Sequence, residues 1–227
     1  MTAAWLLIAN LFALTAFNRL NLAPDTAFDW ISEKSVRPVQ QSWDIVDLHN
    51  RWDAYWYLTI AQEGYDRRGE MDISNVVFFP LYPLLVRIAG PLTNGNLVLA
   101  GWMVSSIFLM LSVWVLTRLT QEFHPEIDPL LPPLFLLVYP AAFFLNAVYS
   151  ESLFLFLSLS MVFLALRRNF FLASLCAALA SATRIAGVFL FVPLLVEFVQ
   201  ANSWRSLWTR RAWPLALAPA RFGRAHV

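Results

Sequence analysis

Residues 97–117 read LVLAGWMVSSIFLMLSVWVLT, a continuous apolar run without a charged side chain. A helix needs roughly 17 to 25 such residues to cross about 30 Å of hydrocarbon at 1.5 Å per residue. Because backbone amides must be paired in lipid, only helices and closed barrels span it, and this run does not alternate as a barrel strand does. The run therefore predicts an all-α, polytopic membrane protein.

Other apolar runs support this prediction. Three of them, residues 2–17, 130–148 and 153–166, are expected to be further spans. Residues 76–92 contain three prolines and one arginine, which predicts a broken or membrane-surface element. Residues 170–199 are too long for one level helix and hold Arg184, which predicts two short helices that meet near residues 182–185.

Composition excludes several classes of protein. Of the 227 residues, 59% are hydrophobic and 14% are charged, and the mean hydropathy is +0.59, unlike an ordinary soluble domain. The net charge of +1, without a run of like charge, gives no attraction for nucleic acid. The single cysteine, Cys176, excludes a disulfide framework.

The basic residues predict the membrane topology. They flank the later spans in three groups, which the positive-inside rule places in the cytoplasm: Arg118, then Arg167 and Arg168, then Arg205, Arg210 and Arg211. The chain is then one membrane domain: a first span (1–17), an extracytoplasmic loop with broken, amphipathic interfacial helices (18–95), transmembrane helices (96–200), and a cytoplasmic segment with an incomplete next helix (201–227). The acidic segment, residues 18–75, contains most of the acidic residues of the chain. It shares the extracytoplasmic face with the turn at residues 149–152 and with Arg184.

Residues 49–61, HNRWDAYWYLTIA, form the first candidate site. Their aromatic and aliphatic side chains recur at helical spacing, and indole and phenol rings suit the headgroup level of a membrane. Asp53 near the first turn then either favours the positive end of the helix dipole or acts as general base on an acceptor hydroxyl. Asp44 and Asp47 are alternatives for that role.

Three charged residues are further candidates. Arg87 either binds a phosphate or extends from a helix end to the headgroups. Glu151 lies in a predicted short loop between two spans. Arg184 lies in an apolar stretch, where a charge is a functional-site candidate; a structural salt bridge with Glu151 is the alternative. No metal-ligand pair, glycine-rich phosphate loop or nucleophile elbow is found, and His49, His124 and His226 are scattered.

Several motifs together resemble the PIG-V family. They are RWDAYWYL at 51–58 with Ile60, Ala61, Gly64 and Tyr65, FFPLYPL at 78–84, YPA at 139–141, YSES at 149–152, and ATR at 182–184 with Gly187. The resemblance covers roughly residues 44–193. It implies a GT-C glycosyltransferase fold, a polyprenyl-phosphate sugar as donor substrate, and a catalytic acid in the first large extracytoplasmic loop. In eukaryotes this family adds the second mannose of the glycosylphosphatidylinositol anchor.

Carried onto this chain, the resemblance implies that Asp53 is the catalytic base. It implies substrate contacts at Arg87, Glu151, Arg184, Trp52 and Tyr149. The expected partners are membrane lipid, the lipid-linked sugar donor, and an acceptor that the sequence does not identify.

 The sequence does not predict whether the reaction requires a divalent metal.

The composition also bears on origin and completeness. With Lys34 as its only lysine and many prolines, the chain is interpreted as bacterial and as a multi-pass protein of the plasma membrane. A new apolar run begins at residue 213 and the chain ends soon after, so it is expected to be C-terminally truncated. The sequence therefore leaves two alternatives to a mannosyltransferase: a lipid or solute transporter, which also uses broken helices and intramembrane charge, and a non-catalytic fragment of such a transferase.

Overall fold

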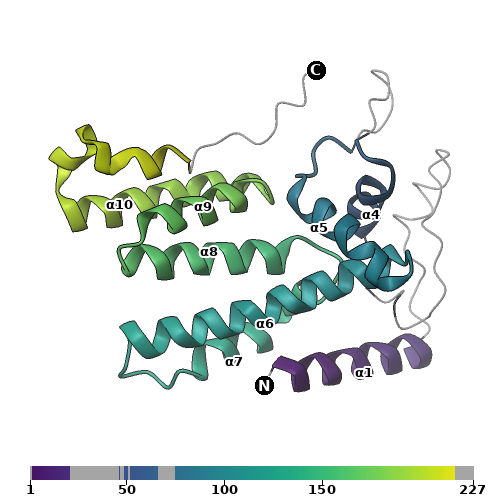
Figure 1. The fold of residues 1–227 in the computed structure, drawn as a ribbon. Helices are drawn as coiled ribbons and strands as arrows, with labels where there is room; N and C mark the ends of the chain where they lie inside the picture. Colours follow the sequence, from purple (N-terminus) through teal and green to yellow (C-terminus); the bar gives the residue numbers. More distant parts are fainter. Residues whose placement is uncertain (1, 21–45, 47–48, 51, 66–74, 218–227) are drawn as a thin grey trace. The chain divides into compact units, whose positions relative to one another are not determined.

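The computed structural model describes residues 2–20, 46, 49–50, 52–65 and 75–217. Within these residues all regular structure is helical and no strand occurs, as Figure 1 shows. The all-α prediction is thus confirmed for the described part of the chain. Several predicted features lie outside it: Asp44, Asp47, Arg51, most of the acidic segment, and the end of the expected next helix.

The described helices follow one another along the chain as α-helices and short 3₁₀ helices. The α-helices are α1 (Thr2–Leu20), α4 (Ala54–Glu63), α5 (Leu81–Ala89), α6 (Leu97–Phe123), α7 (Leu131–Val138), α8 (Glu151–Leu166), α9 (Phe170–Ser181) and α10 (Phe191–Asn202). The 3₁₀ helices are η1 (Gly90–Thr93), η2 (Pro140–Leu145), η3 (Ile185–Leu190), η4 (Trp204–Trp208) and η5 (Arg210–Leu217). Among the described residues, two helical stretches are long and apolar enough to cross a membrane, Leu97–Phe123 and Ile185–Asn202.

Helix α6 matches the apolar run at residues 97–117 and extends beyond it. Asn96 caps its first turn, because the Asn96 Oδ1 atom accepts a hydrogen bond from the Leu99 N–H at 3.0 Å. Large apolar side chains stay exposed along one stripe of the helix: Met103, Ile107, Met110 and Trp114. Exposed apolar side chains at helical spacing are what a lipid-facing helix presents.

The break predicted near residues 182–185 is present. Helix α9 ends at Ser181, Arg184 is extended with φ −155° and ψ 149°, and η3 begins at Ile185. A close backbone approach holds this corner, since a Cβ atom added at Gly187 would lie 2.3 Å from the Ala180 carbonyl carbon. Only glycine fits such an approach.

Two expectations from the sequence are wrong in detail. Residues 130–148 were predicted to form one span, but α7 ends at Val138 and η2 starts at Pro140. The proline lacks an N–H and keeps the preceding Tyr139 extended (ψ 134°), which ends the α-helix. Glu151 was predicted to lie in a loop, but it is the first residue of α8, where a carboxylate favours the helix dipole.

The chain divides into two compact units. Unit 1 comprises Met1–Phe78, Tyr82–Met110 and Leu136–Ser152, and unit 2 comprises Phe79–Leu81, Leu111–Phe135 and Leu153–Val227. Unit 1 has a core of fully buried side chains drawn from α4, α5, α6 and the segment before α8: Leu58, Tyr82, Val86, Val98 and Val148.

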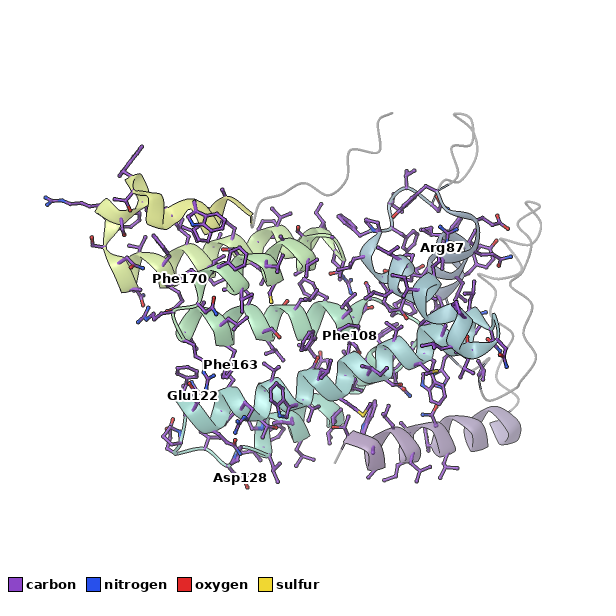
Figure 2. The ribbon with its side chains drawn as sticks, viewed as in Figure 1. Arg87, Phe108, Glu122, Asp128, Phe163 and Phe170 are labelled. Atoms are coloured by element: carbon purple, nitrogen blue, oxygen red, sulfur yellow. The ribbon has the colours of Figure 1, made fainter. Side chains whose placement is uncertain are left out.

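Unit 2 is built around a cluster to which four helices contribute. Figure 1 shows α8, α9 and α10 side by side, and the cluster between them contains Met161, Ala165, Ala173, Ala177, Leu194, Phe198 and Leu215. The alanines of α9 allow its neighbours to approach closely, as small residues do between membrane helices. Phe170, labelled in Figure 2, packs edge-on against Phe198 with ring centroids 5.0 Å apart.

An exposed ion pair joins α6 to the end of α8 within unit 2. Arg167 donates from Nε and Nη2 to the two carboxylate oxygens of Glu122 at 2.8 and 2.6 Å, and Glu122 and Phe163 are both labelled in Figure 2. The Arg167 guanidinium also lies 4.6 Å from the ring centroid of Phe163.

Candidate active site

A pocket of about 400 Å³ opens in unit 1. Its lining consists of Trp52, Asp53, Phe144, Tyr149 and Glu151. These side chains come from three places in the sequence: the start of α4, the 3₁₀ helix η2, and the start of α8. The pocket therefore joins two carboxylates, a phenol and two apolar aromatic faces, a combination suited to a ligand with both hydroxyl groups and apolar ring faces.

Asp53 lies at a corner of the backbone immediately before α4. Its carbonyl accepts the Trp56 N–H at 3.0 Å and so starts the helix, but its side chain does not cap the helix. The preceding Trp52 has a φ of 47°, a left-handed conformation that costs a non-glycine residue on the order of 1–3 kcal/mol. Asp53, which follows this strained backbone turn, has an exposed side chain and lines the pocket.

Tyr149 fixes that corner from a position 96 residues further along the chain. Its Oη atom accepts the backbone N–H of Asp53 at 2.9 Å. Burial raises the pKa of Tyr149, and the negative charges of Asp53 and Glu151 raise it further. The phenol is therefore protonated at neutral pH, and since its oxygen already accepts one hydrogen bond, its proton can be donated to a ligand in the pocket.

A buried hydrogen-bond network that includes Tyr82 and Ser105 holds the backbone of Tyr149. The Tyr82 hydroxyl lies 2.8 Å from Ser105 Oγ and donates to the Gly101 carbonyl at 3.1 Å. Ser105 in turn donates to the Tyr149 carbonyl at 3.2 Å. A Cβ atom at Gly101 would lie 2.6 Å from a methyl group of Val148, so any larger residue at this point of α6 would require Val148 to move.

Aromatic rings pack around Tyr57 on the buried face of α4. Its ring makes edge contacts with Phe78, Tyr82 and Tyr149, with centroids 5.1, 5.2 and 6.0 Å apart. Its hydroxyl lies 3.1 Å from Ser150 Oγ. Edge-to-face pairs of this kind add to the free energy gained from burial, and here they fix α4 against the segment that carries Tyr149.

His49 is buried next to the segment that leads to Tyr149, and only 5% of its surface is exposed. Its ring stacks on Trp102 with centroids 4.6 Å apart, and its carbonyl accepts the Val148 N–H at 3.1 Å. Trp102 donates to Asn146 Oδ1 at 2.9 Å. Burial lowers the pKa of His49 to about 4, against a smaller raising effect of its hydrogen bond to the Asn146 backbone, so the imidazole is neutral at neutral pH.

Four of the six site residues predicted from the sequence line the pocket, and the two arginines do not belong to its lining. Trp52, Asp53, Tyr149 and Glu151 line one pocket. Arg87, labelled in Figure 2, is exposed on α5 and donates to the Gln62 carbonyl at 3.1 Å rather than lining the pocket. Arg184 precedes η3 in unit 2.

Sequence reasoning missed two members of this region. Phe144 lines the pocket, and the only signal for it was its position shortly after the YPA motif. His49 lies within the candidate segment at residues 49–61, two residues before the motif at residues 51–58, but that position alone gives no signal for its burial beside the site. No group of three or more metal-ligating side chains occurs in the part of the chain that the structure describes. Asp53 and Glu151 are the two carboxylate residues among those that line the pocket.

The described residues form helices, two of them long and apolar enough to span a membrane, beside a pocket that combines aromatic and acidic side chains. The family model for mannosyltransferase (PIG-V) matches residues 7–211. The chain belongs to this family of membrane-integral mannosyltransferases.

Two curated relatives are similar over a shorter range. Both are GPI mannosyltransferase 2 of Cryptococcus neoformans var. neoformans serotype D, from strains JEC21 and B-3501A, and each is 28% identical over 157 residues. The aligned part covers 64% of this chain and 36% of each relative, so the match spans about a third of the relatives' length. No solved structure matches the chain.

Proposed function

We propose that the chain carries the transfer site of a membrane mannosyltransferase, which moves mannose from a polyprenyl-phosphate donor to a hydroxyl group on the extracytoplasmic side. The observation that supports this most is the position of Asp53. Its carboxylate lines a pocket beside Glu151, and its backbone is held by the Tyr149 hydroxyl at 2.9 Å. Family membership supports mannose as the sugar.

The proposed step is an inverting displacement. The Asp53 carboxylate takes the proton of the acceptor hydroxyl while the acceptor oxygen forms a bond to the anomeric carbon. The bond between that carbon and the phosphate oxygen breaks, and its electron pair stays on the leaving polyprenyl phosphate. A positioned general base of this kind contributes about 10²- to 10⁴-fold to a rate.

The other pocket residues have distinct proposed roles. The protonated Tyr149 donates a hydrogen bond to an oxygen of the substrate, and Glu151 accepts hydrogen bonds from sugar hydroxyl groups. Trp52 adds an apolar aromatic face for a sugar ring. Arg87 and Arg184 are proposed as contacts for the donor phosphate from the family motifs alone, because arginine matches phosphate oxygens with paired N–H donors.

The test is transfer of radiolabelled mannose from polyprenyl-phosphate mannose to membrane acceptors. Asp53→Asn keeps the shape of the side chain and removes the base, so we expect at least about a hundredfold loss of rate. Glu63→Gln is the matched control, since Glu63 is an exposed carboxylate at the other end of the same helix. Its rate should stay within about twofold of the unmodified chain.

A longer relative with the same motif is assayed in parallel. Transfer by the relative alone would show that activity needs more of the protein than these residues. An Asp53→Asn variant as active as the unmodified chain would refute the role of Asp53. No transfer by either protein from any lipid-linked donor would refute the proposed function and favour the transporter or the non-catalytic alternative.

A further inference from the structure

An exposed surface of tryptophan and arginine follows α10 in unit 2. Trp204, Trp208 and Trp213 are 70%, 93% and 59% exposed, and Arg205 between them is also exposed. We call these four residues the Trp–Arg surface. Side chains as large and apolar as tryptophan are rarely left in water in such a group, so the surface indicates contact with something other than solvent.

The segment that carries this surface is anchored and not a loose tail. On its inner side, Leu215 is buried in the core cluster of unit 2, and Leu207 and Ala212 pack against that cluster. Ser206 is buried as well, and its N–H donates to the Ser203 carbonyl at 3.2 Å. With these residues facing inward, Trp204 and Trp208 of η4 are left outward. The Trp213 ring of η5 lies 5.4 Å from the Phe171 ring, centroid to centroid, and still exposes 59% of its surface.

The charge of the segment has one sign. Glu197 is the last acidic residue of the chain, whereas Arg205, Arg210 and Arg211 follow it. Glu197 itself is paired with Arg168, with 3.7 Å between Arg168 Nη1 and Glu197 Oε2. Among the residues that the structure describes, no carboxylate forms an ion pair with Arg205. The segment therefore has an excess of positive charge that its own acids do not neutralise.

Both properties match one kind of partner. Indole rings prefer the headgroup level of a bilayer, where their apolar body and their N–H are both satisfied. Arginine forms paired hydrogen bonds with phosphate oxygens, and each basic residue near an anionic leaflet strengthens the attraction. We propose that the Trp–Arg surface lies along the membrane surface and binds the headgroups of anionic phospholipids.

Native mass spectrometry of the full chain, purified in detergent, tests this directly. Phosphatidylglycerol and phosphatidylcholine with identical acyl chains are added in turn, and the bound species are counted. We expect phosphatidylglycerol to bind about tenfold tighter, and Arg205→Gln to weaken its binding about fivefold, the effect expected for one basic residue at an anionic surface. Trp204→Ser with Trp208→Ser should weaken the binding of both lipids.

Arg167→Gln is the matched control, because Arg167 is an exposed arginine of the same unit whose charge Glu122 already neutralises. It should leave both affinities unchanged, and circular dichroism checks that each variant stays folded. Equal binding of the two lipids, or an Arg205→Gln variant that retains the preference, would overturn the proposal. A lipid-independent dimer lost in the tryptophan variant would also overturn it, in favour of a second copy of the chain.

The inference is independent of mannosyl transfer. The binding measurement needs no donor or acceptor and uses no residue of the pocket around Asp53. Phosphatidylglycerol binding as expected, with no mannose transfer by either this chain or the longer relative, would support the lipid surface and refute the transfer site. Mannose transfer without any preference for phosphatidylglycerol would do the reverse.

Discussion

Acidification should destabilise the protein through His49. The imidazole is buried against Trp102 and next to the Asn146 backbone, and burial lowers its pKa from 6.5 to about 4. Between these two values the unfolded chain binds a proton that the folded chain excludes. The stabilising contribution of the neutral imidazole is therefore complete above pH 6.5 and is lost as the pH falls toward 4.

The size of the effect follows from the pKa difference. At 1.36 kcal/mol for each pKa unit, the fall from 6.5 to about 4 corresponds to about 3 kcal/mol when the loss is complete. At pH 5 about 2 kcal/mol of this should already be lost. Such a loss is a large fraction of the stability of a typical domain.

The assay is thermal unfolding of the detergent-purified chain at pH 7.5 and pH 5, with His49→Gln beside it. Other groups titrate in this range too, so the informative quantity is the difference in pH dependence between the two proteins. The unmodified chain should lose about 2 kcal/mol more than the variant. His124→Gln is the control, since that histidine is exposed. Identical pH dependence of the unmodified chain and His49→Gln would refute the reasoning.

Three further predictions concern other parts of the chain. Tyr149→Phe removes the acceptor of the Asp53 N–H and should lower the mannosyl-transfer rate about tenfold, whereas an unchanged rate would exclude a positioning role. Gly187→Ala forces a Cβ atom onto the Ala180 backbone and should cost about 1–3 kcal/mol in thermal unfolding; an unchanged melting temperature would contradict the close approach. Glu122→Gln removes the charge that pairs with Arg167 and should lower the melting temperature slightly, as expected for an exposed ion pair; a melting temperature equal to that of the unmodified chain would argue against a stabilising pair.

Much of the helical structure was predictable because its causes are local. A run such as residues 97–117 forms a helix through the length and apolar character of its own side chains. The break before Arg184 follows from a charge in a long apolar stretch. The prediction of one span at residues 130–148 is wrong because Pro140 has no N–H to donate to the preceding turn, so the α-helix ends before it.

The candidate site was predictable in part for the same reason. Asp53 is marked in the sequence by aromatic residues at helical spacing around it, of which Tyr55 and Trp56 lie in α4 and Trp52 precedes it. Phe144 carried no such local signal, and its place in the lining depends on how η2 packs. Glu151 was recognised as a charge between two apolar runs, but its place at the start of α8 was not.

The sequence by itself determined the helical class, the positions of most helices and the family, because apolar length, prolines and short motifs act over a few residues. Only the tertiary structure decided which of those residues meet. The bond from the Asp53 N–H to Tyr149 joins residues far apart in the chain, and the neutral state of His49 depends on its burial against Trp102. The strength of a hydrogen bond and the desolvation of a side chain depend on the groups that surround them in the folded chain. Neither the Asp53–Tyr149 bond nor the pKa of His49 could therefore be predicted from the sequence.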